Sequence, residues 1–288
     1  MRAFVFIAVS MLCWSLMEIL GPGTGVSGYQ VVWMRYGVHL LGMLILLGPR
    51  HGARLVRTPH LGQQVFRSLL MLGMPLCFLW SVERIAFRNT LAVFWICPLV
   101  LIAVTQMFGE KSGSLKLLLA TVPGFLGAML IYRPDARVLH PAAVLALVMA
   151  LCFAMYLVVS RRMKEEFIFS KLFHTALWVF ASLTVFLPWF WLTPTIRGFA
   201  SVVAIAVLGW CGLFMLDRAV ELSSPAHLAP MLYLQVVGIV LIEAVTTRHL
   251  PGPRNIVGVL FIAIGLVVAV VRNYDLAMAS DTVAGYPR

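Results

Sequence analysis

The chain has 288 residues, of which 61% are hydrophobic and 11% are charged, and it carries a formal net charge of +11. Soluble domains carry about 25% charged and roughly 45–50% apolar residues, so this composition excludes a water-soluble enzyme and indicates a chain surrounded mostly by lipid. The basic excess is therefore expected in loops at the membrane surface. Without a cluster of basic and aromatic residues, it does not predict nucleic-acid binding.

Apolar runs bounded by charged residues, glycine or proline divide the chain into segments long enough to cross a bilayer as helices. In chain order they are Ala3–Leu20, Tyr29–Leu47, Val65–Val82, Thr90–Phe108, Leu115–Tyr132, Val138–Ser160, Leu172–Leu192, Phe199–Leu216, His227–Thr246 and Ile256–Val271. Closed β-strands are excluded because the runs are continuous instead of alternating, and are about twice the ~10 residues of a barrel strand. We therefore expect an all-α integral membrane fold with ten transmembrane helices.

The distribution of basic residues predicts that both chain ends lie in the cytoplasm. With the N-terminus inside, the loops on that side carry about twice as many Lys and Arg residues as the opposite loops, and Arg67 is counted among them. Cytoplasmic loops are enriched in these two residue types.

The ten segments fall into two groups of five, residues 1–134 and residues 135–288. A repeated unit with an odd number of helices sits in the membrane in opposite orientations, as in many secondary transporters. The stretch Asn89–Glu110 has a counterpart in Ser224–Glu243, and each contains a proline followed by an apolar span. The sequence thus predicts two inverted five-helix repeats.

Several motifs, taken in order, resemble the EamA-type drug/metabolite transporters. They are Cys13-Trp14-Ser15, Arg35-Tyr36, Asn89 to Lys111 with its closing Gly-Glu-Lys, Ala229 to Val237, and the spaced glycines Gly258 and Gly265. The resemblance implies a ten-helix carrier of the bacterial inner membrane, commonly an exporter of amino-acid-like or other small metabolites, with a central cavity between the halves. Where the family often has Gly-Glu after the ninth helix, this chain has Ile242-Glu243.

Two ionisable residues lie deep in the first two segments, where a charge needs a partner or a watery cavity. Glu18 lies 16 residues after Arg2, and Arg35 lies 15 residues before Arg50. At the helical rise these separations place them about 24 Å and about 22 Å from the cytoplasmic edge. We therefore expect a Glu18–Arg35 ion pair, which either recognises the amine and carboxylate of a zwitterion or clamps the first two helices together.

His39 and Trp14 extend this expected group. His39 follows Arg35 by four residues and Trp14 precedes Glu18 by four, so each lies on the same helix face as its neighbour. The four side chains are candidates for one substrate cavity. His39 is either a proton acceptor in coupled transport or a hydrogen-bonded packing residue.

Prolines in the fourth and ninth segments indicate where the substrate pathway lies. Pro98 and Pro230 each free a backbone carbonyl, and such helix breaks often line the binding cavity of inverted-repeat carriers. The nearby side chains Trp95, Tyr233 and Gln235 are therefore candidate binding residues, with simple packing as the alternative for the aromatic ones.

Three further groups of charged residues lie near the segment ends. Glu243 either titrates in proton coupling, as Glu18 and His39 could, or ends its helix in interfacial water. The groups expected to pair internally are Glu83, Arg84 and Arg88 at the outer end of the third segment, and Asp217, Arg218 and Glu221 at the inner end of the eighth.

The leading functional hypothesis is a secondary carrier that alternates access and exports a small zwitterion, an amino acid or a derived compound such as an opine-type metallophore, with or without proton coupling. A passive channel is the alternative. A membrane-embedded enzyme is disfavoured because no nucleophile or metal motif is present, and the absence of a nucleotide-binding motif indicates that ATP is not the energy source within this chain. We expect no cofactor or metal, a monomer or homodimer in the lipid bilayer, and packing roles for five cysteines that stand singly, Cys13, Cys77, Cys97, Cys152 and Cys211.

Overall fold

The computed structural model describes residues 2–109 and 115–284, with the side chains of this part described up to residue 271 except at residue 22, and their regular structure is entirely helical. The long rods are α1 (Arg2–Leu20), α2 (Gly28–Leu46), α5 (Leu61–Ile85), α6 (Phe87–Phe94) with α7 (Cys97–Met107), α8 (Leu115–Tyr132), α9 (Ala143–Arg162), α10 (Ile168–Thr184), α12 (Ile196–Leu222), α14 (Leu234–Thr247) and α15 (Pro253–Ala284). Short elements connect them: η1 (Gly21–Thr24), α3 (Gly48–His51), α4 (Ala53–Val56), η2 (Ala136–Leu139), α11 (Leu187–Phe190), α13 (Pro225–Leu228) and η3 (Ala229–Tyr233). The all-α integral membrane fold expected from the composition is confirmed.

Length and hydropathy allow eight of the described helices to cross a membrane. The apolar helix α10 is shorter, at 17 residues. Helix α2 has the length of a span but carries the polar residues Gln30, Arg35 and His39. Because lipid offers no hydrogen-bond partners, these side chains must face the protein interior.

Two rods are interrupted by short breaks near prolines. Helix α6 ends at Phe94 and α7 begins at Cys97, with Pro98 in the first turn of α7. In the ninth segment, which comprises α13, η3 and α14, Pro230 lies in the 3₁₀ turn η3. Proline lacks the N–H that a continuous helix requires, so each helix is interrupted close to its proline.

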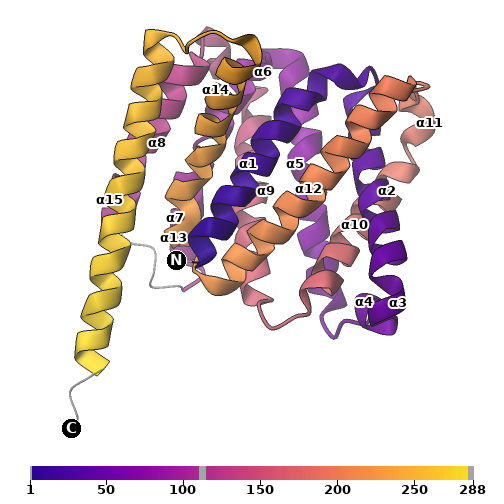
Figure 1. Cartoon of the computed structure of the whole chain (residues 1–288), viewed down its shortest axis with the longest axis horizontal. Helices are drawn as coiled ribbons and strands as arrows, with labels where there is room; N and C mark the ends of the chain where they lie inside the picture. The colour runs from indigo at the N-terminus through magenta and orange to yellow at the C-terminus, as the bar shows by residue number, and fades with distance from the viewer. Residues whose placement is uncertain (1, 110–114, 285–288) are drawn as a thin grey trace.

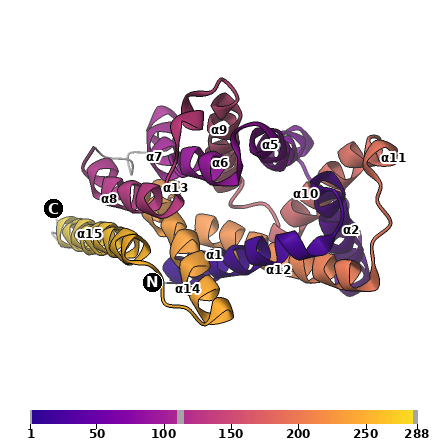
Figure 2. The ribbon, with the colours of Figure 1, turned by 90° about the horizontal axis from the view of Figure 1, so that it is seen from above.

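The helices form two facing rows, best seen from above (Figure 2). Helices α8, α6, α9 and α5 lie along one row, and α15, α14, α1 and α12 lie along the other, with α2 and α10 at the end farthest from α8 and α15. Helix α1 packs along α12 and α14, α5 along α9, α8 along α15, and α2 along α10. Each of these pairs joins residues 1–134 to residues 135–288.

The two sides of the molecule are named here by α1. Helix α1 begins and α2 ends on the N-terminal side, while the turn that joins them lies on the α1–α2 side (Figure 1). Helices α9 and α12 run from the α1–α2 side to the N-terminal side, and α5 runs in the opposite direction (Figure 1).

Several predicted helix ends need correction. The sixth segment begins at Ala143 instead of Val138, because Asp135 caps the separate turn η2. The seventh helix ends at Thr184 instead of Leu192, since Pro188 opens the short helix α11. The last helix continues beyond the predicted end to Ala284. Of the predicted Gly-Glu-Lys motif, Glu110 and Lys111 lie outside the described residues.

Candidate functional site

A cavity of about 440 Å³ lies between the two rows, in the part of the molecule nearest the α1–α2 turn. The second half of α1, the first half of α2 and the part of α5 from Met71 onward line this cavity. Helices α6, α9, α12 and α14 complete the wall. A cavity of this size suits a drug-sized or cofactor-sized molecule.

The wall is mostly apolar, with few polar groups. The aromatic and sulfur-containing lining residues are Trp14, Met17, Tyr36, Met71, Met74, Phe78, Phe87, Phe94, Trp95 and Met149. Glu18 and Arg35 are its two charged side chains among the described residues, and Gln235 adds an amide. Such a wall favours a flat or apolar body that carries both a cationic and an anionic group.

Glu18 is held by the ninth rod. The side-chain amide of Gln235 donates a hydrogen bond of 3.1 Å to the carboxylate of Glu18. The hydroxyl of Ser15 donates to the backbone carbonyl of Gln235 at 2.9 Å. A Cβ at Gly238 would lie 3.0 Å from the Cβ of Ser15, so this glycine lets α1 approach α14 closely. The break before α14 thus places Gln235 opposite Glu18.

The expected ion pair between Glu18 and Arg35 is wrong. Among the described ion pairs, none joins these two residues. The guanidinium of Arg35 lies 5.0 Å from the ring centre of Tyr36 and packs over Gly209, where a Cβ would lie 2.6 Å from its Nε. Helical rise fixes the depth of a residue but not its direction around the helix axis. Glu18 turns toward α14 and Arg35 toward α12, so the two charges lie on separate parts of the cavity wall.

The two predicted tryptophans both line the cavity. Trp14 packs on Gly212, where a Cβ would lie 2.5 Å from its Nε1, and its ring centre is 5.6 Å from that of Phe153. Trp95 lies at the break between α6 and α7, with its ring centre 5.8 Å from that of Tyr233. The Tyr233 hydroxyl donates a hydrogen bond of 3.1 Å to the backbone carbonyl of Trp95, so Tyr233 links the two broken rods from behind the wall.

His39 and Glu243 lie outside the cavity lining. His39 is buried at 2% exposure and stacks between Tyr36 and Trp210, with ring-centre distances of 6.3 and 5.2 Å. Glu243 lies exposed near the end of α14, where its backbone carbonyl accepts hydrogen bonds from Thr246 and Thr247. The structure therefore brings together Trp14, Glu18, Arg35, Trp95 and Gln235 around one cavity, but not His39 or Glu243.

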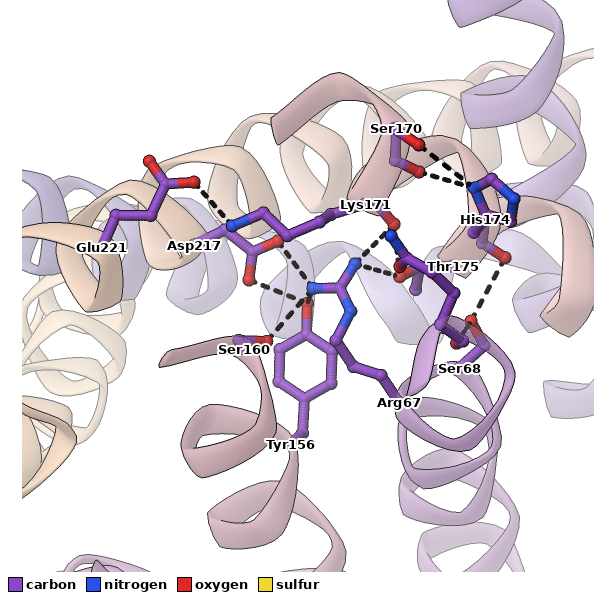
Figure 3. Close-up of polar contacts among 11 residues, drawn as sticks. Arg67, Ser68, Tyr156, Ser160, Ser170, Lys171, His174, Thr175, Asp217 and Glu221 are labelled. Carbon is purple, nitrogen blue, oxygen red and sulfur yellow. Dashed lines mark hydrogen bonds and ion pairs between the residues drawn. The ribbon is translucent and has the colours of Figure 1, made fainter. Parts of the chain in front are cut away.

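A fully buried charge network, which sequence reasoning missed, surrounds Arg67 (Figure 3). This residue was assigned to an inner loop, but α5 begins at Leu61 and the Arg67 side chain is completely buried. Its guanidinium donates to Asp217 Oδ2 at 2.8 Å, Tyr156 Oη at 2.9 Å, Ser160 Oγ at 3.1 Å, Thr175 Oγ1 at 2.8 Å and the carbonyl oxygen of Lys171. Arg67, Tyr156, Ser160, Lys171, Thr175 and Asp217 are called the Arg67 cluster below.

The cluster continues into a second ion pair. The Tyr156 hydroxyl also donates to Asp217, at 3.0 Å. The Lys171 ammonium contacts Glu221 at 2.6 Å, and Arg218 contacts the other carboxylate oxygen of Glu221 at 2.7 Å. The predicted pairing of Arg218 with Glu221 is therefore confirmed, while Asp217 pairs with Arg67 instead. In the sequence, the only indication of this network is the acidic residue Asp217 in an otherwise mostly apolar segment, because a carboxylate at such a position needs a buried partner.

The charges near the outer end of α5 pair only partly as expected. Glu83 and Arg84 form an exposed contact of 3.8 Å, while Arg88 reaches Asp135 at 2.6 Å. Arg88, and then Arg137, hold the pKa of the Asp135 carboxyl well below its usual value through hydrogen bonds. Asn89 donates to the same carboxylate at 3.0 Å, so the connection between α8 and η2 is tied to the start of α6.

No group of three or more His, Cys, Asp or Glu side chains that could hold a metal ion occurs in the part of the chain that the structure describes. The five cysteines are unpaired, and they are distributed over five different helices. The charged and amide side chains among the described cavity-lining residues are Glu18, Arg35 and Gln235.

Comparisons with known proteins agree with this architecture. Residues 140–271 match the family described as the EamA-like transporter family. Among solved structures, one crystal structure superposes with a TM-score of 0.84, covering 93% of this chain and 97% of that chain at 16% identity, which supports the fold.

Curated relatives extend the likeness beyond the matched region. The S-adenosylmethionine uptake transporter of Rickettsia bellii is 22% identical over 75% of this chain and 74% of its own length. The protein of the same description from Rickettsia conorii is 23% identical over 83% and 82%. The riboflavin transporter of Brucella anthropi is 26% identical over 49% of each chain. Together with the helical architecture, these likenesses make the chain similar to the EamA-like transporter family, whose model matches residues 140–271.

Proposed function

We propose that this multi-pass membrane transporter is a secondary carrier that moves a small zwitterion with a flat apolar part by alternating access between residues 1–134 and 135–288. The observation that carries the proposal is the cavity, where Glu18 and Arg35 are the two charges in an aromatic and methionine-rich wall. A carboxylate and a guanidinium on separate parts of that wall match a ligand whose cationic and anionic groups are also separated. We place the chain in the bacterial inner membrane with the N-terminal side in the cytoplasm.

The relatives guide the choice of test substrates. Two of them are described as S-adenosylmethionine uptake transporters and one as a riboflavin transporter. An amino-acid derivative that carries a heterocycle combines the ammonium, the carboxylate and the flat body that the cavity favours. Free amino acids and opine-type metallophores have the same charged groups without that heterocycle, so they are the comparison ligands.

Direction and coupling are parts of the same proposal. The family resemblance favours export, while the two Rickettsia relatives are described as uptake transporters. An alternating-access carrier without an ATPase is reversible, so the gradients set the net direction. Glu18 is the proposed coupling group, because it lies in the cavity where a proton and a cationic ligand can replace one another.

Proteoliposomes that contain the purified protein test the function. Influx and efflux of labelled S-adenosylmethionine, riboflavin, tryptophan and an opine-type metallophore are measured with and without a proton gradient. We expect saturable transport and counterflow of one heterocyclic zwitterion, and counterflow separates a carrier from a channel. If the transport rate is the same with and without the proton gradient, proton coupling is refuted.

Substitutions assign the recognition step. A hydrogen bond to a charged group contributes about 1.5–3 kcal/mol, so Glu18→Gln and Arg35→Gln should each weaken apparent affinity by roughly 10- to 150-fold. Glu243→Gln and Arg84→Gln make the same chemical changes at exposed positions and should transport like the wild type. Wild-type affinity in both cavity variants would refute recognition by this pair of charges.

A further inference from the structure

The Arg67 cluster lies between the cavity and the N-terminal side. On α5, Met71 lines the cavity and Arg67 lies four residues nearer the N-terminal side, which is about 6 Å along the helix. On α12, Ile205 lines the cavity and Asp217 lies twelve residues farther toward the same side, about 18 Å away. Tyr156 is displaced in the same direction from the lining residue Met149 on α9.

The cluster also joins the two halves of the chain through a single side chain. All five hydrogen-bond acceptors of Arg67 belong to residues 135–288, on α9, α10 and α12. On the next residue of α5, the Ser68 hydroxyl donates to the carbonyl of His174 on α10 at 3.2 Å. Figure 3 shows the Arg67 guanidinium inserted among side chains of these three helices. A path from the cavity to the N-terminal side between the halves therefore requires α5 to separate from them.

The chemistry of the cluster suits a contact that opens and closes. An ion pair that loses one partner while it stays buried leaves an uncompensated charge, which is strongly unfavourable. When the halves separate and water enters, both Arg67 and Asp217 become hydrated, so neither charge stays buried alone. A closely packed apolar seal would instead expose hydrophobic surface each time it opened.

We propose that the Arg67 cluster is the gate that closes the cavity on the N-terminal side, with Arg67 as the residue that joins the two halves there. This inference rests on the proposed alternating access, because a gate has a role only if that side opens. The ammonium of Lys171, which belongs to the cluster, pairs with Glu221, and Glu221 pairs with Arg218. His174 and Tyr36 lie beside the cluster.

A labelling experiment tests the gate. Gln64 lies one helical turn from Arg67 toward the N-terminal side, is fully buried, and its side-chain amide has no hydrogen-bond partner among the described residues. Gln64→Cys therefore breaks no side-chain hydrogen bond, and in a protein whose five native cysteines are changed to alanine it reports access from that side. The measurement is the rate of reaction with a hydrophilic maleimide in detergent.

The informative variant removes both charges together. Arg67→Met with Asp217→Leu keeps the net charge and leaves no unpaired buried ion. We expect labelling at position 64 to become at least tenfold faster, with Arg67→Lys in between. The control, Glu83→Gln with Arg84→Gln, removes an exposed ion pair at the other end of the same helix and should label like the reporter alone.

Each outcome decides the proposal. Equal labelling rates in the double variant and the reporter would overturn the gate. If cysteine replacement disturbs folding, hydrogen exchange of residues 61–68 in the protein with its native cysteines gives the same readout, with faster exchange expected in the double variant. Failure of the proposed function appears separately, as absence of counterflow for every compound in the wild type. If the wild type shows counterflow but the double variant changes neither the labelling rate at position 64 nor the hydrogen exchange of residues 61–68, the gate is overturned and the proposed function stands.

Discussion

Gly258→Ala probes the close contact between α8 and α15. A Cβ at Gly258 would lie 2.8 Å from the backbone carbonyl oxygen of Gly127 and 2.7 Å from Cγ1 of Ile131. Ordinary van der Waals contact begins at 3.4 Å, so the two helices must move apart by about 0.6 Å, and the Ile131 side chain must shift with them or change rotamer. The carbonyl oxygen belongs to the backbone of a packed helix and cannot move independently, so the variant forces a change in helix separation.

The expected cost is about 1–3 kcal/mol, the usual range for overpacking a close contact. Alanine is a better helix former than glycine by about 0.8–1.0 kcal/mol in water. That gain is largely absent here, because a membrane-spanning segment in lipid or detergent stays helical even when its helix–helix contacts are lost. The steric term therefore decides the sign.

Thermal unfolding in detergent measures the effect, followed by fluorescence of a size-exclusion peak after heating. Gly62→Ala is the matched control, because Gly62 is also helical but has no atom within 4 Å of the added Cβ. We expect Gly258→Ala to unfold at a lower temperature and Gly62→Ala to behave like the wild type. Since neither α8 nor α15 contributes a lining residue to the described cavity, apparent substrate affinity should be unchanged. Equal stability of the two variants would refute the packing argument.

Two further predictions concern the loops and the broken rods. Because Arg88 lowers the folded-state pKa of Asp135, the ionised carboxylate stabilises the fold above its unfolded pKa of about 3.9, and this contribution should be lost as pH falls through lower values. Unfolding temperature measured from pH 6 to pH 3 should show a smaller decrease in Asp135→Asn than in the wild type, and identical curves would contradict it. Tyr233→Phe removes the hydrogen bond to the Trp95 carbonyl and should cost about 0.5–1.5 kcal/mol of unfolding free energy in the same thermal assay, which an unchanged unfolding temperature would exclude.

The helical architecture could be predicted from the sequence because lipid leaves the backbone few choices. Continuous apolar runs must form helices, and the run that ends at Tyr132 matches the C-terminal end of α8. Boundaries set by local turn chemistry were less predictable. Hydropathy carried the seventh segment to Leu192, whereas Pro188 begins a new short helix after α10 has already ended.

The cavity was only partly predictable. Glu18 and Arg35 were found because charges are rare at membrane depth, and Gln235 because it follows a helix break. The partner of each charge was not predictable, since it depends on the direction of the side chain around its helix axis. Glu18 contacts Gln235, and Arg35 packs on Gly209. Arg67 was missed for a related reason: a basic residue near the start of a span looks like a loop residue until tertiary contacts show what surrounds it.

The contacts between the halves differ in burial at the two ends of the cavity: on the α1–α2 side, the hydrogen bonds of Gln30 with Leu192 and of Trp33 with Thr184 are part-buried or exposed, whereas those of Arg67 are buried. At the cavity wall, the Gln235 amide makes a single hydrogen bond to the Glu18 carboxylate. On the N-terminal side, Arg67 alone makes five hydrogen bonds across the same division. A cationic group that reaches Glu18 must share or replace the Gln235 amide, so ligand binding changes a contact between α1 and α14 without touching Arg67. Any effect of the ligand on the Arg67 cluster must then pass through movement of whole helices, which the labelling rate at position 64 measures directly when ligand is added.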